Sequence, residues 1–461
     1  MTDSKRPAAR GQRAQWSSRL AFVLAAAGSA VGLGNIWKFP YITGENGGGA
    51  FVLVYLLCIA VIGIPIMMAE VFVGRSGRRN PVSSVRLLAE RNGRLPAWRG
   101  AAAIGVLAAF LILSFYSVIG GWAAAYVGHA ALGDFIGLNA DAIGQLFGGL
   151  LASPGVLLFW HSLFMALVTL VVALGLKSGL ERAVTTLMPA LLVLLLIAVG
   201  YATTTGHFGQ AVDFLFRPNF AALTMNGVLI AMGHAFFTLS LGMGVMMAYG
   251  SYLGPDISIA RTAVTVSVMD TVVALLAGLA IFPVVFANGL EASAGPGLIF
   301  RTLPLAFGQM PMGSLFGALF FILLVFAAWT SAISLLEPVV EWLEEKRGMN
   351  RTGSAVVAGV ACWLLGIASI LSLNIWSDVA PLGMFDRFAG KTIFDLLDFF
   401  TANVLLPLSG LLTALFVGWA VSRRALEDDL QMTPAGFRTW LSLLRVVTPL
   451  AVAVVFVYNL L

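Results

Sequence analysis

Residues 28–35 read GSAVGLGN and lie in the middle of a segment that is otherwise apolar. Glycine destabilises the interior of a helix, so this composition favours an interruption. Residues 238–244 read TLSLGMG and bring a similar mixture into a second apolar segment. Interrupted backbone at membrane depth is tolerated only where protein or a polar cavity satisfies its amides and carbonyls. The two stretches therefore predict two broken membrane helices that face one another across a binding site.

Close helix packing is the alternative explanation for the first stretch, because Gly28 and Gly32 fit the small-xxx-small pattern of membrane helix contacts. Packing does not explain why Asn35 and Lys38 lie in the same segment, which Pro40 closes. Polar and charged groups are costly in lipid and usually mark a pathway for ions or solutes. We therefore favour a binding site over a packing motif.

The composition is that of a polytopic membrane protein. The 461 residues are 59% hydrophobic and 11% charged, with a mean hydropathy of +0.93. Segments long enough to cross a hydrocarbon core of about 30 Å predict an all-α bundle. We predict eleven spans at residues 17–41, 48–76, 100–130, 155–176, 183–202, 222–250, 262–288, 313–343, 353–371, 394–421 and 439–460.

The distribution of Lys and Arg predicts the orientation in the membrane, since short loops rich in these residues stay cytoplasmic. They concentrate in the N-terminal tail and in the even-numbered connections, above all at residues 75–99. We expect a cytoplasmic N-terminus and, with an odd number of spans, a C-terminus outside. The tail before Trp16 is polar, and no cleavable signal peptide is expected.

The two breaks lie in spans one and six, five helices apart. Inverted repeats place their discontinuous helices at equivalent positions, with the site at the midplane between them. We predict a cytoplasmic tail at residues 1–16 and one transporter domain at residues 17–461. Within it, repeat one covers about 17–202, repeat two about 222–421, and an extra helix about 439–460.

Other classes of protein find little support. The cysteines, Cys58 and Cys362, lie in apolar spans, and the four histidines show no metal-binding spacing. No cluster of nucleophile, base and metal ligands indicates an enzyme, and we expect no cofactor and no nucleic-acid partner. A transporter-like sensor would need an output domain, for which the tails are short. A channel needs only one gate, whereas two broken helices suit alternating access.

The first break and its flanks resemble the first-helix signature of the neurotransmitter:sodium symporter family. The signature comprises residues 27–41, AGSAVGLGNIWKFPY, and residues 45–51, ENGGGAF. The likeness covers nearly the whole chain and continues through Gly63-Ile64-Pro65 to Glu70, Gly74-Arg75, Phe115-Tyr116 to Trp122, Ala235 to Gly244, Ala327 to Ser331, and Asp398-Phe399. It implies sodium-driven uptake of an amino acid across a bacterial-type inner (plasma) membrane.

The resemblance implies two sodium ions, carried as cargo and held by oxygen ligands. Site 1 would comprise Ala30, Asn35, Thr238 and Asp270. Site 2 would comprise Gly28, Val31, Ala327, Thr330 and Ser331. For Thr330 and Ser331 an alternative stays open, because hydroxyl groups in helices can bond back to their own helix.

Asp270 and His234 bear on the anion requirement. Chloride-dependent members of the family place chloride near Asp270, and chloride-binding members have Gln where this chain has His234. The resemblance therefore implies that fixed negative charge from Asp270 replaces chloride. His234 either exchanges protons with Asp270 or stays neutral, satisfied by a backbone carbonyl, and we favour the second.

The substrate positions match a site for an amino acid, with amides and a hydroxyl for its carboxylate and carbonyls for its ammonium group. They are Ser29, Ala30, Leu33, Gly34, Ile112, Tyr116, Phe237, Thr238, Ser240, Met243, Ser331 and Leu335. Monoamine carriers have Asp where this chain has Gly32, so the resemblance implies an amino acid. Gly242-Met243-Gly244 resembles the region of bacterial members that accept bulky hydrophobic or aromatic amino acids, and we expect a substrate of that type. A glycine, GABA or taurine type of zwitterion and a membrane sensor remain the alternatives.

The resemblance also assigns an outer gate and two structural polar residues. The gate comprises Lys38, Asp398 and Phe237. Family members have Arg in place of Lys38, and Lys cannot form a planar two-bond fork with a carboxylate. The gate is then looser, or Lys38 contacts the substrate. Glu70 matches a buried acid that bonds to the broken backbone of span six; the alternative is an ion pair at the end of a helix. His234 is the second structural polar residue.

Overall fold

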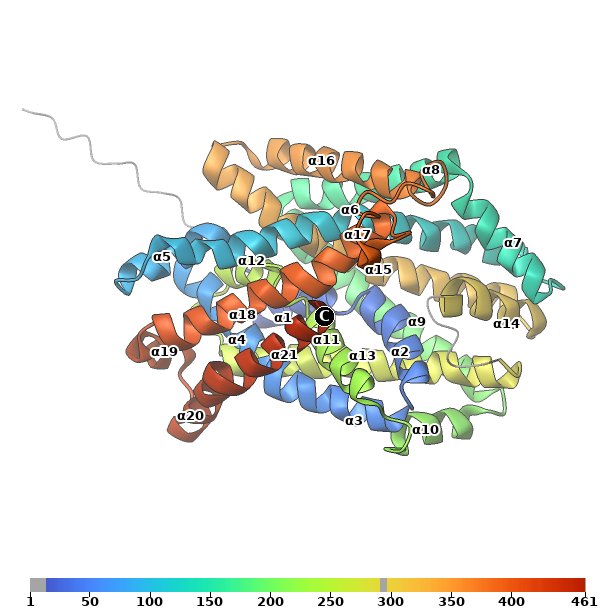
Figure 1. The fold of residues 1–461 in the computed structure, drawn as a ribbon, viewed down its shortest axis with the longest axis horizontal. Coiled ribbons are helices and arrows are strands. Elements are labelled where there is room, and N and C mark those ends of the chain that lie inside the picture. Colours follow the sequence, from blue (N-terminus) through green and yellow to red (C-terminus); the bar gives the residue numbers. More distant parts are fainter. Residues whose placement is uncertain (1–13, 291–296, 461) are drawn as a thin grey trace, which may run out of the picture.

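The computed structural model describes residues 14–290 and 297–460, and its named elements are all helical (Figure 1). Most of the predicted tail, residues 1–13, lies outside the described residues. Within the described residues, nine helical segments are long and apolar enough to cross a membrane. They are Gly49–Gly77, Pro96–Leu132, Pro154–Ala173, Leu176–Thr203, Ile259–Ala287, Gly313–Arg347, Arg351–Leu371, Ile393–Ala420 and Pro434–Leu460.

These segments contain the named elements of Figure 1, several with an internal π-helix. The bounds are α3 Gly49–Cys58, η2 Ile59–Gly63, α4 Ile64–Gly77, η3 Pro96–Trp98, α6 Arg99–Leu132, α8 Pro154–Ala173, η4 Leu176–Glu181, α9 Arg182–Thr203, α13 Ile259–Ala287, α15 Gly313–Arg347, α16 Arg351–Leu371, α17 Ile393–Phe400, η7 Thr401–Leu405, α18 Leu406–Leu415, η8 Phe416–Ala420, α20 Pro434–Ser442, η9 Leu443–Val447 and α21 Thr448–Leu460. Shorter helices connect them: α5 Pro81–Arg91, α7 Ala140–Leu151, α10 Phe208–Phe216, η5 Leu298–Thr302, α14 Leu303–Gln309, η6 Asp386–Phe388 and α19 Arg423–Leu430.

The first predicted span is broken where the glycines lie. Helix α1 (Arg19–Ala30) ends at Ala30, and Val31 leaves the helical region with ψ 97°. The chain resumes as η1 (Gly34–Lys38) and α2 (Phe39–Glu45), bent by 50° from α1. The Ser18 hydroxyl caps the start of α1 by accepting from the Ala21 amide at 3.1 Å.

The sixth predicted span is also divided. Helix α11 (Met225–Thr238) ends at the threonine of the second stretch, and α12 (Val245–Ser251) begins after it. Between them Gly242 and Gly244 have φ angles of +73° and +72°, which favour glycine, and Ser240 has +53°. A Cβ atom on Gly242 would lie 2.5 Å from the Leu406 carbonyl oxygen. With the bent pair counted as one span, length and composition support up to ten spans among the described residues; α11 is a shorter apolar helix, so the eleventh span, over residues 222–250, stays a prediction.

The broken segments lie inside the bundle. Helix α1 packs against α9, α13 and α15, and α12 packs against α4. Most side chains of α1 and all those of α12 are buried. The unpaired backbone at the breaks is therefore enclosed by protein, as membrane depth requires.

Candidate functional site

A small cavity of about 30 Å³ lies between the two breaks. Eleven of the twelve predicted substrate residues line it, and Gly32 is the twelfth lining residue. The lining residues are Ser29, Ala30, Gly32, Gly34, Ile112, Tyr116, Phe237, Thr238, Ser240, Met243, Ser331 and Leu335. Leu33, the remaining predicted residue, donates its amide hydrogen to the Tyr116 hydroxyl oxygen at 3.1 Å.

The wall formed by the first break is polar and tightly packed. The Ser240 hydroxyl, on the second break, donates to the Ser29 carbonyl at 2.8 Å and so ties the two breaks together. A Cβ atom on Gly32 would lie 2.4 Å from the Ser331 hydroxyl oxygen and 2.9 Å from the Tyr116 hydroxyl oxygen. Even a methyl group at position 32 would therefore displace the polar groups of this wall.

Asp270, on α13, is fully buried beside the two breaks. Its carboxylate accepts from the Asn35 side-chain amide at 2.7 Å and from the Thr238 hydroxyl at 3.1 and 3.2 Å. The Tyr55 hydroxyl also donates to it, at 3.3 Å. These contacts join three of the four residues predicted for sodium site 1. The sequence prediction missed Tyr55, which gave no local signal in an apolar span.

A second group of oxygens surrounds the Ser331 hydroxyl. This hydroxyl lies 3.1 Å from the Ser29 carbonyl oxygen and 3.4 Å from the carbonyl oxygens of Gly28 and Val31. Thr330 behaves differently, because its hydroxyl donates to its own helix, at the carbonyls of Phe326 and Ala327. In this structure the Thr330 hydroxyl therefore bonds to its own helix, as the alternative interpretation allowed, whereas the Ser331 hydroxyl faces the first break.

Two further buried side chains, Glu70 and His234, differ in their hydrogen bonding. Glu70 accepts from the Gly242 amide at 2.7 Å, so it holds the broken backbone between α11 and α12. His234 is 2% exposed, and its ring packs against those of Phe39 and Tyr55, which also contact each other. Neither of its ring nitrogens has a hydrogen-bond partner within the described parts of the chain. The favoured expectation, a histidine satisfied by a backbone carbonyl, therefore does not describe this structure.

Two of the three predicted gate residues, Lys38 and Phe237, line a larger cavity of about 290 Å³, and Asp398 does not. Phe237 lines both this cavity and the small one, so its ring separates them. The Lys38 ammonium nitrogen lies 5.0 Å from the centre of that ring. Asp398 is exposed, and no ion pair joins it to Lys38 among residues 14–290 and 297–460. The gate pair is thus not formed in this conformation.

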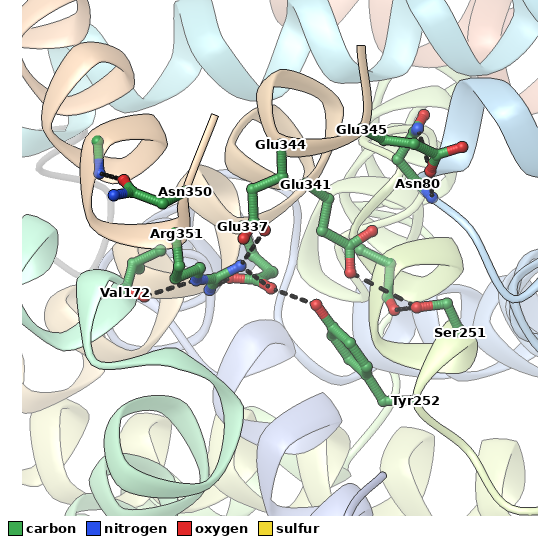
Figure 2. Close-up of polar contacts among 12 residues, drawn as sticks. Asn80, Val172, Ser251, Tyr252, Glu337, Glu341, Glu344, Glu345, Asn350 and Arg351 are labelled. Carbon is green, nitrogen blue, oxygen red and sulfur yellow. Dashed lines mark hydrogen bonds and ion pairs between the residues drawn. The ribbon is translucent and has the colours of Figure 1, made fainter. Parts of the chain in front are cut away.

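At the opposite end from the gate, α12 is tied to the helices around it (Figure 2). Glu337, fully buried on α15, accepts from the Tyr252 hydroxyl at 2.9 Å and pairs with Arg351 at the start of α16. Arg351 also pairs with Glu344 at 3.1 Å and donates to the Val172 carbonyl at 2.9 Å. Sequence reasoning missed this network. The sequence did contain one indication of it: Glu337 lies inside a predicted span, where an isolated acidic side chain is costly.

The arrangement suits alkali cations better than transition metals. In the described residues no group of three or more His, Cys, Asp or Glu side chains could hold a metal ion. Carbonyl, hydroxyl, amide and carboxylate oxygens converge instead on the two breaks, and such hard ligands suit alkali cations.

Comparisons with known proteins agree with the fold. The model of the sodium:neurotransmitter symporter family matches residues 13–133 and 149–461. An uncharacterized sodium-dependent transporter, YhdH of Bacillus subtilis (strain 168), is 41% identical over 96% of both chains. An uncharacterized sodium-dependent transporter of Haemophilus influenzae is 35% identical over 97% of this chain and 98% of its own.

A solved structure, the crystal structure of MhsT in complex with L-phenylalanine, superposes with a TM-score of 0.87. It is 43% identical to this chain and covers 97% of it, and all of the MhsT chain is matched. The family model spans nearly the whole chain, and two relatives above 30% identity match it from end to end. The chain therefore belongs to the sodium:neurotransmitter symporter family and is a sodium-dependent membrane transporter.

Proposed function

We propose that this transporter couples sodium entry to the uptake of a hydrophobic or aromatic amino acid by alternating access. It would act in a bacterial-type inner membrane, with the N-terminus cytoplasmic and the C-terminus outside. The observation that carries the proposal is the contact of Asp270 with Asn35 at the first break and with Thr238 at the second. These contacts adjoin the cavity lined by the predicted substrate residues.

Sodium site 1 would form where Asp270 now accepts hydrogen bonds. A cation there would replace the donated hydrogens with direct contacts to the Asp270 carboxylate, the Thr238 hydroxyl oxygen and the amide oxygen of Asn35. A fully buried carboxylate without a compensating cation is costly, so the ion and the acid stabilise one another. Because Asp270 belongs to α13 and the others to the two breaks, sodium would hold the three segments together.

Sodium site 2 would form around Ser331. Its hydroxyl already faces the carbonyl oxygens of Gly28 and Val31, two residues predicted for this site. Rotation of the hydroxyl hydrogen would turn the same oxygen into a ligand. Thr330 would have to release its bonds to Phe326 and Ala327 to contribute its hydroxyl.

The cavity chemistry supports an amino-acid substrate. Amides and the Tyr116 hydroxyl at the first break can donate to a carboxylate, and Ile112, Met243 and Leu335 offer an apolar side. The absence of an acidic side chain at Gly32 disfavours a monoamine. L-phenylalanine is bound to MhsT in the similar structure, and we extend that substrate class to this chain.

The size of the cavity limits the conformation that can bind. About 30 Å³ holds little more than a water molecule or two. A side chain as large as phenylalanine therefore requires the pocket to open, and Phe237 and the flexible Met243 are the lining residues that we expect to move. The same small volume favours glycine as the second candidate substrate.

Asp270 also supports chloride independence, because its fixed negative charge would take the place of an anion near the bound sodium. A charged Asp270 would make the site negative without a bound anion, so transport would not need external chloride. The His234 ring packs at a tilt against Tyr55, which bonds to Asp270, and it makes no direct hydrogen bond to that acid.

Uptake by purified transporter in liposomes tests the proposal. Each of the twenty amino acids is offered with an inward sodium gradient, with choline in place of sodium and with gluconate in place of chloride. We expect accumulation of hydrophobic or aromatic amino acids that requires sodium and persists in gluconate. Counterflow of labelled substrate would distinguish a carrier from a sensor. Sodium-independent uptake would refute the ion assignment, and loss in gluconate would refute the chloride assignment.

A further inference from the structure

Two arginines and a tryptophan form an unusual surface at one end of the bundle. We call it the Arg445 face and define it as Trp419 at the end of η8, Arg445 in η9 and Arg438 in α20. Figure 1 shows α5, α19 and α20 at this end, which is the end we propose to be cytoplasmic. Arg438 is exposed, and it lies seven residues, about two helical turns, before Arg445.

Arg445 lies within a membrane-spanning segment on a side that faces outward. Its neighbours Val446, Val447 and Leu450 are 51%, 40% and 63% exposed, as expected of side chains that contact lipid. Of its nitrogens, Nε donates to the Gly418 carbonyl at 2.6 Å. No carboxylate pairs with Arg445 or Arg438 in the described ranges. A guanidinium on a lipid-facing surface is costly without an anionic partner.

Trp419 completes the surface. Its side chain is 58% exposed, its ring centre lies 5.1 Å from the Arg445 guanidinium, and its indole nitrogen donates to the Arg445 carbonyl at 3.2 Å. The stacked ring fixes the guanidinium by a cation–π contact. Tryptophan at the end of a span is typical of the headgroup level of a membrane. The unpaired charge is therefore held where phosphate groups lie.

We propose that the Arg445 face binds the headgroup phosphate of an anionic phospholipid, with the acyl chains along Val446 and Leu450. Charge complementarity carries the choice of occupant: in the part of the chain that the structure describes, the two guanidiniums have no acidic partner, and exposed apolar side chains follow Arg445 in the same span. Two acids in this part of the chain already form ion pairs with other arginines: Glu427 with Arg423 and Asp429 with Arg75. The lipid would bridge η8 and η9 and stabilise their contact.

Quenching of Trp419 by brominated lipids tests this proposal. The transporter is reconstituted in phosphatidylcholine vesicles that contain either dibrominated phosphatidylglycerol or dibrominated phosphatidylcholine. The chain has 11 tryptophans, so the Trp419 signal is taken as the difference between each protein and its Trp419→Phe counterpart. We expect stronger quenching by the anionic lipid, and a preference that weakens as salt rises.

Substitution then assigns the preference to the arginines. Each arginine near a membrane surface contributes about 1 kcal/mol of attraction to anionic lipid, or about fivefold in relative affinity. Arg445→Gln and Arg438→Gln should each lower the preference by about that factor. Arg261→Gln, an exposed arginine at the start of α13, should leave it unchanged.

Two results would overturn the proposal. One is equal quenching of Trp419 by the anionic and the zwitterionic lipid. The other is a preference that survives both arginine substitutions. Arg445 also bonds to the Gly418 carbonyl, so Arg445→Gln is checked for a monodisperse elution profile. If that variant does not fold, Arg438→Gln decides, because the hydrogen bond of the Arg438 side chain within the described residues is to the Pro434 carbonyl of its own helix.

Discussion

Asp270→Asn is the substitution that probes the proposed ion chemistry most sharply. It keeps the shape of a side chain that is fully buried and that accepts from Asn35, Thr238 and Tyr55. It removes a formal negative charge that contacts both breaks. The neutral amide can still offer one oxygen to a cation, so the experiment isolates the effect of charge.

The expected loss follows from the contacts. Two unit charges about 4 Å apart interact by about 4 kcal/mol at an effective dielectric constant of about 20, which sets an upper bound. Hydrogen bonds to charged groups contribute about 1.5–3 kcal/mol, and we use this smaller range because the amide oxygen remains a ligand. We therefore expect the sodium concentration for half-maximal binding to rise about 10- to 100-fold, at about 1.4 kcal/mol per tenfold.

The assay is equilibrium binding of a labelled substrate as sodium is titrated, with choline keeping ionic strength constant. Asp213→Asn, an exposed aspartate on α10, is the matched control and should bind sodium as the native protein does. Thermal unfolding would show that the variant is folded, since the new amide meets the Asn35 amide group. An unchanged sodium titration in folded Asp270→Asn protein would refute the placement of an ion beside this carboxylate.

Three other substitutions have outcomes that the contacts define. Ser331→Ala removes the hydroxyl that faces three carbonyls of the first break, and it should raise the sodium requirement for binding about tenfold, whereas Ser153→Ala, at the half-buried residue before α8, should not. Gly32→Ala puts a methyl group 2.4 Å from the Ser331 oxygen, and uptake should fall at least about tenfold; Gly128→Ala, with nothing within 4 Å, should transport normally. Arg351→Gln leaves the buried Glu337 without its cation, so the free energy of unfolding should fall by about 3 kcal/mol. A melting temperature equal to that of the exposed control Arg347→Gln would contradict that estimate.

The positions of the helices and of both breaks could be predicted from local chemistry. Long apolar runs must be helical at membrane depth, because every backbone group needs a partner. Glycine and serine in GSAVGLGN and TLSLGMG mark the places where a helix is least stable, and α1 and α11 end there. The wide π-helical turns, such as η2 at Ile59–Gly63, have no comparable signal, since their residues are as apolar as the helix around them.

The residues around the cavity could be named only through the family resemblance, because local sequence does not say which spans touch. Tyr55 and Asp270 are 215 positions apart and are joined by one hydroxyl group. Glu337 could have been singled out as an acid within an apolar span, but its partner Tyr252 comes from another span. His234 shows a further limit: the sequence suggests that a buried imidazole finds an acceptor, and the packing of Phe39 and Tyr55 against its ring leaves it without one.

The central claim is that sodium and substrate are held together between the two breaks, and reciprocal binding measurements test it most directly. The substrate dissociation constant is measured by calorimetry over a range of sodium concentrations, and the sodium affinity is then measured with and without saturating substrate. Linkage requires that each ligand changes the affinity of the other by the same factor. The account predicts a factor well above one in both titrations, reduced by Asp270→Asn. Substrate affinity that is independent of sodium would contradict it.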